Sequence, residues 1–264
     1  MLRTSKSFAV GGVCLVVVAC VASAVVLITR ASGESSSVVQ NSRSSKVNKG
    51  HRNLSLQPEA SRVARQLGKR FWAVSRAVSA SSGQLSIGGT QEPVTIIRRQ
   101  TEDGETVELN RANRAVTWSA GEGTNANAGV ASENERLLME RLILDSPDNF
   151  VLAQLRGASY FIVARNIRPT DAIDGYDGPL WNLVRVDETQ RDERLRPLST
   201  WRIYYINVQT GLPDRVEYQL NGKEIRAEFL DWTDQQGDKT PSYVRWTSDG
   251  QIVMEYRATT VSHN

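Results

Sequence analysis

The sequence has few of the side chains that most often act as nucleophiles or metal ligands. Both of its 2 cysteines, Cys14 and Cys20, lie in an apolar stretch near the amino terminus. The rest of the chain therefore has no disulfide, no thiol nucleophile and no cysteine-based zinc site. The 2 histidines are His51, in a polar segment, and His263, next to the carboxyl terminus. We expect neither to be rigidly held, which argues against Ser-His-Asp or Cys-His catalysis and against a histidine-rich metal cluster.

A large excess of charge is also missing. The formal net charge is +3, whereas a nucleic-acid-binding domain is expected to carry a clustered basic face. We therefore predict no nucleic-acid partner. Asp171, Asp174 and Asp177 recur at every third position, but calcium loops of the EF-hand type place their acidic residues at alternate positions. We predict neither a metal nor a cofactor.

Without a rigidly placed histidine or cysteine, an enzyme would need a pair of carboxylates, as in glycoside hydrolysis. The candidate pairs are Asp145 with Asp148 and Asp231 with Asp234. Each pair lies near a predicted turn, where exposure to solvent explains the charge. The pattern does not indicate perturbed acids in a cleft. We therefore predict that the protein is not an enzyme and has no catalytic residues.

One long apolar run is present, from Phe8 to Thr29. About 20 apolar residues are enough to span a bilayer as a helix. Ala22–Ala24 has the pattern of a signal-peptidase site, but the apolar run continues beyond it, which favours an uncleaved signal anchor over residues 1–29. Arg3 and Lys6 precede the run, and this places the amino terminus in the cytoplasm and exports the rest.

Val17–Cys20 allows an alternative, because it resembles a bacterial lipobox in which Cys20 becomes the lipidated first residue. Both interpretations tether the chain to a membrane with its remaining residues outside the cytoplasm. Residues 30–56 are rich in Ser, Asn and Lys and have few apolar side chains. Such a segment cannot bury enough surface to fold, so we predict a flexible linker.

Pro58–Ala80 has the periodicity of an amphipathic helix. Its apolar side chains recur at spacings of four and three: Val63, Leu67, Phe71, Val74 and Val78. Its basic side chains, including Arg70, fall largely on other faces, where we expect solvent. The apolar face is predicted to pack on a sheet, with binding to a lipid surface as the alternative. A capping box, Ser132–Glu135, predicts the start of a second helix.

Short alternating segments predict strands in the rest of the chain. They lie within residues 83–118, 158–164 and 179–186 and, most clearly, from Trp201 to the carboxyl terminus. Asn221-Gly222 and Asp249-Gly250 separate alternating runs and predict tight hairpins. Consecutive hairpins predict an antiparallel meander. Residues 121–129 and 188–196 are predicted loops.

The carboxyl-terminal third has a further pattern of turn residues. It comprises Val208–Pro213 before a strand, Phe229–Trp232, Gly237 with Pro241, and Val261–Asn264. This pattern resembles the bacterial outer-membrane lipoprotein carriers of the LolA/LolB-like fold. The resemblance implies a mainly β (α+β) domain over residues 57–264. It also implies an unclosed antiparallel β-barrel of about ten strands, with helices that cover the open side and an inner surface that holds acyl chains.

We therefore predict a binding protein anchored in the inner (cytoplasmic) membrane by a single span, with its carboxyl-terminal domain in the periplasm. Its partners would be the membrane and a hydrophobic ligand such as a lipid or a lipoprotein acyl chain. The alternative is an envelope protein–protein interaction, assembly or sensing module whose core is filled. The residues predicted to line a hydrophobic concavity are Phe71, Val74, Trp118, Trp181, Trp201, Ile225, Phe229, Ile252, Met254 and Tyr256.

Overall fold

The computed structural model describes residues 56–71, 77–101, 104–119, 123–126, 131–169, 176–191 and 197–263. All of them belong to one compact unit, Asn48–Asn264. The predicted anchor Phe8–Thr29, the lipobox and the linker up to residue 55 lie outside the described residues. Within the described residues, no helix has the length and apolar character needed to cross a membrane.

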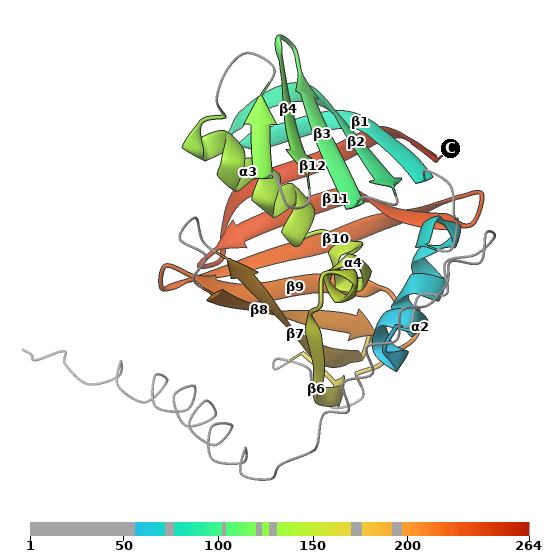
Figure 1. Ribbon diagram of the computed structural model, residues 1–264. Helices are drawn as coiled ribbons and strands as arrows, with labels where there is room; N and C mark the ends of the chain where they lie inside the picture. The colour runs from blue at the N-terminus through green and yellow to red at the C-terminus, as the bar shows by residue number, and fades with distance from the viewer. Residues whose placement is uncertain are drawn as a thin grey trace, which may run out of the picture. The chain divides into compact units, whose positions relative to one another are not determined.

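The described part of the chain forms one twelve-stranded antiparallel sheet, against a prediction of about ten strands (Figure 1). The strand order is β5-β4-β3-β2-β1-β12-β11-β10-β9-β8-β7-β6, and no described strand pairs with the outer edge of β5 or β6, so the sheet is unclosed. The strands are β1 (Ala77–Ile87), β2 (Thr90–Thr101), β3 (Gly104–Arg111), β4 (Arg114–Ser119), β5 (Gly123–Ala126), β6 (Ser159–Ile167), β7 (Trp181–Arg191), β8 (Pro197–Asn207), β9 (Pro213–Leu220), β10 (Lys223–Gln235), β11 (Asp238–Ser248) and β12 (Gln251–His263).

The predicted hairpins are confirmed. Asn221 and Gly222 join β9 to β10 with φ of 52° and 77°, and Asp249 and Gly250 join β11 to β12 with φ of 48° and 78°. Positive φ at both central residues is the requirement of the tight turn that matches strand twist. These turns and the alternation of the flanking strands fix the register of the carboxyl-terminal meander.

Four helical segments accompany the sheet: α2 (Pro58–Leu67), the 3-10 turn η1 (Lys69–Phe71), α3 (Glu133–Leu144) and α4 (Asn149–Leu155). The sheet bends around α3 and α4, and α2 lies beside α4 (Figure 1). The predicted capping box is present at the start of α3, since Ser132 accepts from the Glu135 amide and the Glu135 carboxylate accepts from the Ser132 amide. The apolar stripe of α2 faces the interior, where Val63 and Leu67 are fully buried.

The helix predicted over Pro58–Ala80 is shorter than the periodicity indicated. It ends at Leu67, and residues 77–80, Val78 among them, begin β1. Gly68 explains the early end, because its φ is 127° and a Cβ there would lie 2.3 Å from the Asp238 carboxylate. A side chain at this position is excluded by the close approach of the β10–β11 turn, and the backbone conformation breaks the helix.

The two predicted loops are shorter than expected. The small-residue segment 121–129 contains β5, which pairs with β4 although it lacks apolar alternation. In the charged segment 188–196, β7 continues to Arg191 and pairs along its whole length with β8. Hydrogen bonds to a neighbouring strand satisfy the backbone groups of both segments. The local amino-acid composition does not reveal such pairing.

Candidate ligand-binding site

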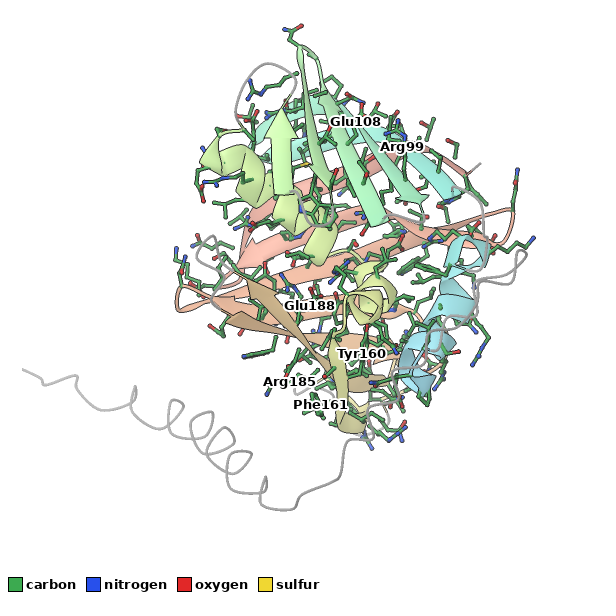
Figure 2. The ribbon with its side chains drawn as sticks, viewed as in Figure 1. Arg99, Glu108, Tyr160, Phe161, Arg185 and Glu188 are labelled. Atoms are coloured by element: carbon green, nitrogen blue, oxygen red, sulfur yellow. The ribbon has the colours of Figure 1, made fainter. Side chains whose placement is uncertain are left out.

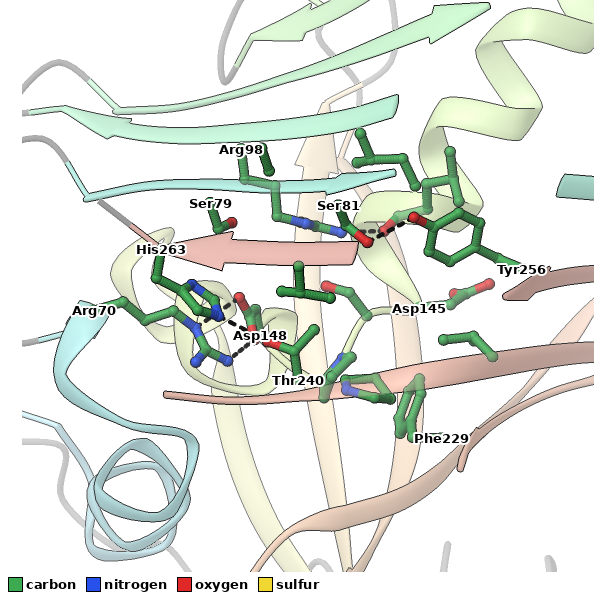
Figure 3. Close-up of a pocket in the computed structure, with 18 of the residues that line it drawn as sticks. Arg70, Ser79, Ser81, Arg98, Asp145, Asp148, Phe229, Thr240, Tyr256 and His263 are labelled. Atoms are coloured by element: carbon green, nitrogen blue, oxygen red, sulfur yellow. Dashed lines mark hydrogen bonds and ion pairs between the residues drawn. The ribbon is translucent and has the colours of Figure 1, made fainter. Parts of the chain in front are cut away.

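A cavity of about 90 Å³ lies between the sheet and the connection between α3 and α4, residues 145–148 (Figure 3). Strands β1, β2, β10, β11 and β12 form its floor, and Arg70 from η1 closes one end. The sequence resemblance implies a ligand held under the helices, and this cavity is our candidate for that space. The lining residues are Arg70, Ser79, Ala80, Ser81, Ile96, Arg98, Leu142, Asp145, Ser146, Pro147, Asp148, Phe229, Thr240, Pro241, Val244, Trp246, Tyr256, Val261 and His263.

The cavity has a largely apolar wall with polar atoms at defined places. Phe229, Val244 and Trp246 reach it from β10 and β11, and all three are buried. Alternation along these strands turns their side chains to the same face of the sheet. On the other side, the Tyr256 hydroxyl lies 2.6 Å from the Ser81 hydroxyl. A wall of this composition suits an apolar group with few polar atoms.

Two residues that line the cavity have a buried side-chain nitrogen with no hydrogen-bond partner among the described residues. The two nitrogens are the indole Nε1 of Trp246 and Nδ1 of His263. Leaving a buried polar group unpaired costs about 1–3 kcal/mol. The indole N–H is a donor only. A ligand atom that accepts a hydrogen bond, such as a carbonyl or carboxylate oxygen, would remove this cost.

Arg70 links three elements at one end of the cavity, although its place in the sequence pattern predicted a solvated face. Its side chain is 9% exposed and forms two hydrogen bonds with the Asp148 carboxylate, Nε to Oδ2 at 3.2 Å and Nη2 to Oδ1 at 2.7 Å. Its backbone amide donates to Asp238 at 3.0 Å. Burial opposes the charge of Asp148, but Arg70 outweighs it and lowers the pKa of that carboxyl. Arg70 therefore attaches η1 to the helix connection and to the β10–β11 turn.

His263 corrects the expectation that neither histidine is rigidly placed. It is paired in β12 opposite Ser79, and its Nε2 lies 3.3 Å from the Thr240 hydroxyl. Burial, together with the positive charge of Arg70, lowers the pKa of His263 and favours the neutral ring. Figure 3 shows Arg70, Asp148 and His263 together at one end of the cavity. His263 comes from the last described strand, so its position depends on the pairing of β12 with β1.

Asp145 also departs from the expectation of a solvent-exposed turn. It is fully buried. Its carboxylate accepts from Arg202 Nε at 3.2 Å and from the Tyr218 hydroxyl at 2.9 Å. Burial raises the pKa of Asp145, with the charge of Arg202 opposing that rise. A raised carboxyl pKa is typical of acid–base sites but also of structural ion pairs. Here the hydrogen bonds tie the helix connection to β8 and β9.

The structure places the predicted concavity residues in three groups. Five are buried on the helix side: Phe71, Ile225, Phe229, Met254 and Tyr256. Of these, Phe229 and Tyr256 line the cavity. Trp118 is partly buried against the same core, and Val74 lies outside the described residues. The contact of each with a ligand stays a prediction.

Trp181, Trp201 and Ile252 lie elsewhere. Buried Val184 and Val186 alternate with Trp181 along β7, so Trp181 is on the outer face, where its indole donates to Asp214. Trp201 is 37% exposed, and the Arg185 guanidinium lies over its ring. Large aromatic side chains were expected inside, but alternation along β7 and β8 turns these two outward. Figure 2 places Arg185 on the β7 ribbon, away from the α4 side on which Glu188 lies.

Ile252 is 56% exposed because a β-bulge interrupts the alternation of β12. Its partner is Thr247, whereas Met254 pairs with buried Trp246, and the register shifts between these two pairs. Directly opposite residues share a face, so the extra residue turns Ile252 to the outside. Period-two counting from Met254 and Tyr256 cannot reveal a bulge, and the prediction for Ile252 was wrong for this reason.

The described residues contain no group of three or more His, Cys, Asp or Glu side chains placed to hold a metal ion. Asp177, one of the three aspartates that the sequence places near each other, is described, while Asp171 and Asp174 lie outside the described residues. The prediction of no metal at that segment therefore stays a prediction.

Comparison with known proteins finds similarity in fold alone. No family model and no curated protein matches the chain. Among solved structures, a LolA superfamily protein from Nitrosomonas europaea is 11% identical, with a TM-score of 0.47 over 77% of this chain and 92% of that protein. A DUF1329 family protein from Desulfovibrio piger is 10% identical, with a TM-score of 0.43 over 78% of this chain and 92% of that protein. Because both TM-scores are below 0.5, the proposals below rest on the contacts of this chain.

Proposed function

We propose that the domain is a binding module that holds an apolar ligand, such as a lipid or a lipoprotein acyl chain, between its sheet and its helices. The observation that carries the proposal is the cavity under the α3–α4 connection. Its wall is largely apolar, and Trp246, which lines it, has a buried indole N–H with no acceptor among the described residues. An apolar chain that bears a carbonyl or carboxylate oxygen meets both features.

The size of the cavity indicates how such a ligand would enter. At about 90 Å³ it is smaller than the roughly 300–1,000 Å³ of pockets that enclose drug-sized ligands. A long acyl chain would therefore need the helix connection to move from the sheet. Polar contacts hold it there, including the donation from Arg98 to the Leu142 carbonyl and the pairing of Arg70 with Asp148. Polar contacts can be exchanged for water at modest net cost, which suits a site that opens.

The proposed setting follows from the amino-terminal sequence. The apolar run Phe8–Thr29 would hold the chain in the inner membrane as a single span, and residues 30–56 would let the domain reach ligands in the periplasm. Lipidation at Cys20 would give the same placement by another anchor. These assignments extend the proposal and are tested by protease accessibility of the domain in spheroplasts.

Native mass spectrometry of the full chain, purified in detergent, tests the proposed function. We expect a co-purified lipid mass on the wild-type chain and its loss in Ser79→Leu, because Ser79 lines the cavity and leucine would fill it. The matched control is Ser262→Leu, an exposed serine on β12 that pairs with Ala80, the residue next to Ser79. No lipid on the wild-type chain, or equal lipid on both variants, would reject the proposal.

An interaction module remains the second candidate, favoured by β6. This edge strand exposes Phe161, Ile162 and Val163, and no described strand pairs with its outer edge. Exposed edge strands accept an added strand from a partner. The candidate is supported if a photo-crosslinking residue at position 163 captures an extended segment of an envelope protein while no lipid co-purifies. Phe161→Ser should then abolish the capture.

A further inference from the structure

A second hollow of about 190 Å³ lies between α3 and the adjoining parts of β8 and β9. The contacts described so far involve its wall and do not account for its empty space. Its position relative to α3, β8 and β9 can be followed in Figure 1. The lining residues are Leu137, Glu140, Arg141, Leu144, Thr200, Trp201, Arg202, Tyr218, Gln219 and Leu220.

This hollow combines exposed apolar side chains with basic groups. Leu137 on α3 is 42% exposed and Leu220 on β9 is 38% exposed, and both line it. Arg141, one helical turn after Leu137, and Arg202 on β8 line the same space. Side chains four residues apart lie on one face of a helix, so Leu137 and Arg141 face the hollow together. An apolar rim beside guanidinium groups suits an amphiphile with an anionic head.

The lining of the hollow carries two basic side chains and one acidic one, Arg141, Arg202 and Glu140. Burial raises the pKa of Asp145 and of Tyr218, and the charges of Arg202 and Arg141 oppose both rises, so both guanidinium groups act on the same region. Burial also raises the pKa of Glu140, and a raised carboxyl pKa favours the neutral form. Because Asp145 already pairs with Arg202, an anion in the hollow would meet Arg141 as its main cation.

The second hollow and the first cavity share a wall. Asp145 lines the first cavity, and its two hydrogen-bond partners, Arg202 and Tyr218, line the second hollow. One layer of side chains thus separates the two spaces. Because Asp145 in this layer is fully buried, the two spaces are separate sites.

We propose that the second hollow binds an anionic amphiphile, with its carboxylate or phosphate head at Arg141 and the start of its apolar chain on Leu137 and Leu220. This inference concerns a second site and goes beyond the proposed function. Guanidinium groups pair with carboxylates and phosphates through two parallel hydrogen bonds. Arg141 is the primary contact, because Arg202 already donates to Asp145.

Native mass spectrometry of the full chain with oleate or methyl oleate tests the inference, since the two ligands share a chain and differ in charge. We expect the wild-type chain to bind oleate more tightly, and Arg141→Gln to raise the apparent Kd for oleate about tenfold, as expected for a lost charge-assisted hydrogen bond. Binding of methyl oleate should not change. Lysophosphatidate in place of oleate shows whether a phosphate head is accepted as well.

The matched control is Arg136→Gln, an arginine of the same helix that pairs with Glu133 and does not line the hollow. An equal loss of oleate binding in both variants would mean that the net charge of the protein attracts oleate. It would overturn the inference, because a specific site at Arg141 would then not be needed. Oleate and methyl oleate bound equally by the wild-type chain would overturn it while leaving the proposed function intact. Binding of neither ligand would also overturn the inference, whereas the proposed function is decided by the co-purified lipid. Unchanged thermal unfolding of both variants shows that they fold.

Discussion

The inner side of the sheet consists of two regions that differ in how they are filled. Beneath α4, strands β6 to β8 meet a closely packed aromatic cluster. The Phe150 ring lies edge-on to Tyr160 and Tyr204, with centroids 5.2 Å and 5.0 Å away. Phe150 and Tyr204 are fully buried. Figure 2 shows Tyr160 on β6 directed toward α4. This filled region resembles the interior of a small barrel that side chains close completely.

Beneath the α3–α4 connection, β1, β2 and β10 to β12 leave the cavity instead. The covering segment there is held by hydrogen bonds and ion pairs of Arg70, Arg98 and Asp145. In the filled region, side chains close the space between α4 and the sheet, whereas the hollow region keeps a cavity between the sheet and the covering segment. Substitutions in the filled and the hollow region test this difference, and the largest effect is expected in the filled region.

Removing the centre of the filled region should have the largest effect. Phe150→Ala is expected to lower the free energy of unfolding by about 3–5 kcal/mol, because a buried ring is lost and a cavity remains. Urea unfolding followed by circular dichroism measures the change. For comparison, Phe161→Ala on the exposed outer face should cost well under about 1 kcal/mol. Equal costs at both positions would show that the aromatic cluster does not support the fold.

Replacing a small side chain with a larger one should also affect the two regions differently, with a smaller difference in the free energy of unfolding. Ala153 on α4 is fully buried in the filled region, so Ala153→Leu should cost about 1–3 kcal/mol through overpacking. Ser79→Leu places the same side chain in the cavity and should change stability by less than about 1 kcal/mol, because space is present. Thermal and urea unfolding of both variants give the comparison. A larger cost for Ser79→Leu would contradict the existence of the cavity.

How well the sequence predicts a feature depends on whether its contacts are local or join residues far apart along the chain. The hairpins at Asn221-Gly222 and Asp249-Gly250 depend on local turn residues, and the capping box depends on Ser132 and Glu135, so the sequence indicates them correctly. Gly68 ends α2 because of a turn far along the chain, at Asp238. Periodicity alone could not show this, and the predicted helix was too long for that reason.

The composition of the cavity was predicted only in part. Phe229 and Tyr256 follow from strand alternation, which is a local pattern. Arg70, Asp145 and His263 do not, because a charged or polar residue near a turn is usually solvated. Their partners lie far along the chain: Asp238 is 168 positions from Arg70, Tyr218 is 73 positions from Asp145, and His263 is placed by the pairing of β12 with β1. The signal that could have drawn attention to Arg70 is its spacing of three residues from Leu67, which puts it on the apolar stripe.

The amino terminus of α3, the helix that leads into the covering segment, should respond to acid. Arg114 and Ser132 hold the pKa of Glu135 at about 2, below its ordinary value of 4.5. Because the folded pKa is the lower one, the stabilisation by Glu135 is complete above about pH 4.5 and is lost as the pH falls toward about 2. The effect is small, about 0.5–1 kcal/mol, since Arg114 is partly exposed. At the start of α4, burial opposes the charge of Asp148 but Arg70 outweighs it and lowers that pKa as well; both groups of this pair are more deeply buried than Arg114, so α3 should loosen first.

Hydrogen exchange at pH 3 and pH 6, corrected for the intrinsic rates, measures this difference. We expect amides in the first turns of α3 to lose protection at pH 3 while those of α4 keep it. Glu135→Gln should show the weaker protection of α3 at both pH values, because glutamine does not titrate and forms no ion pair with Arg114. Equal loss in α3 and α4, or an unchanged acid response in Glu135→Gln, would assign the effect to global unfolding. It would then give no support to a covering segment that opens over the hollow region while the filled region remains folded.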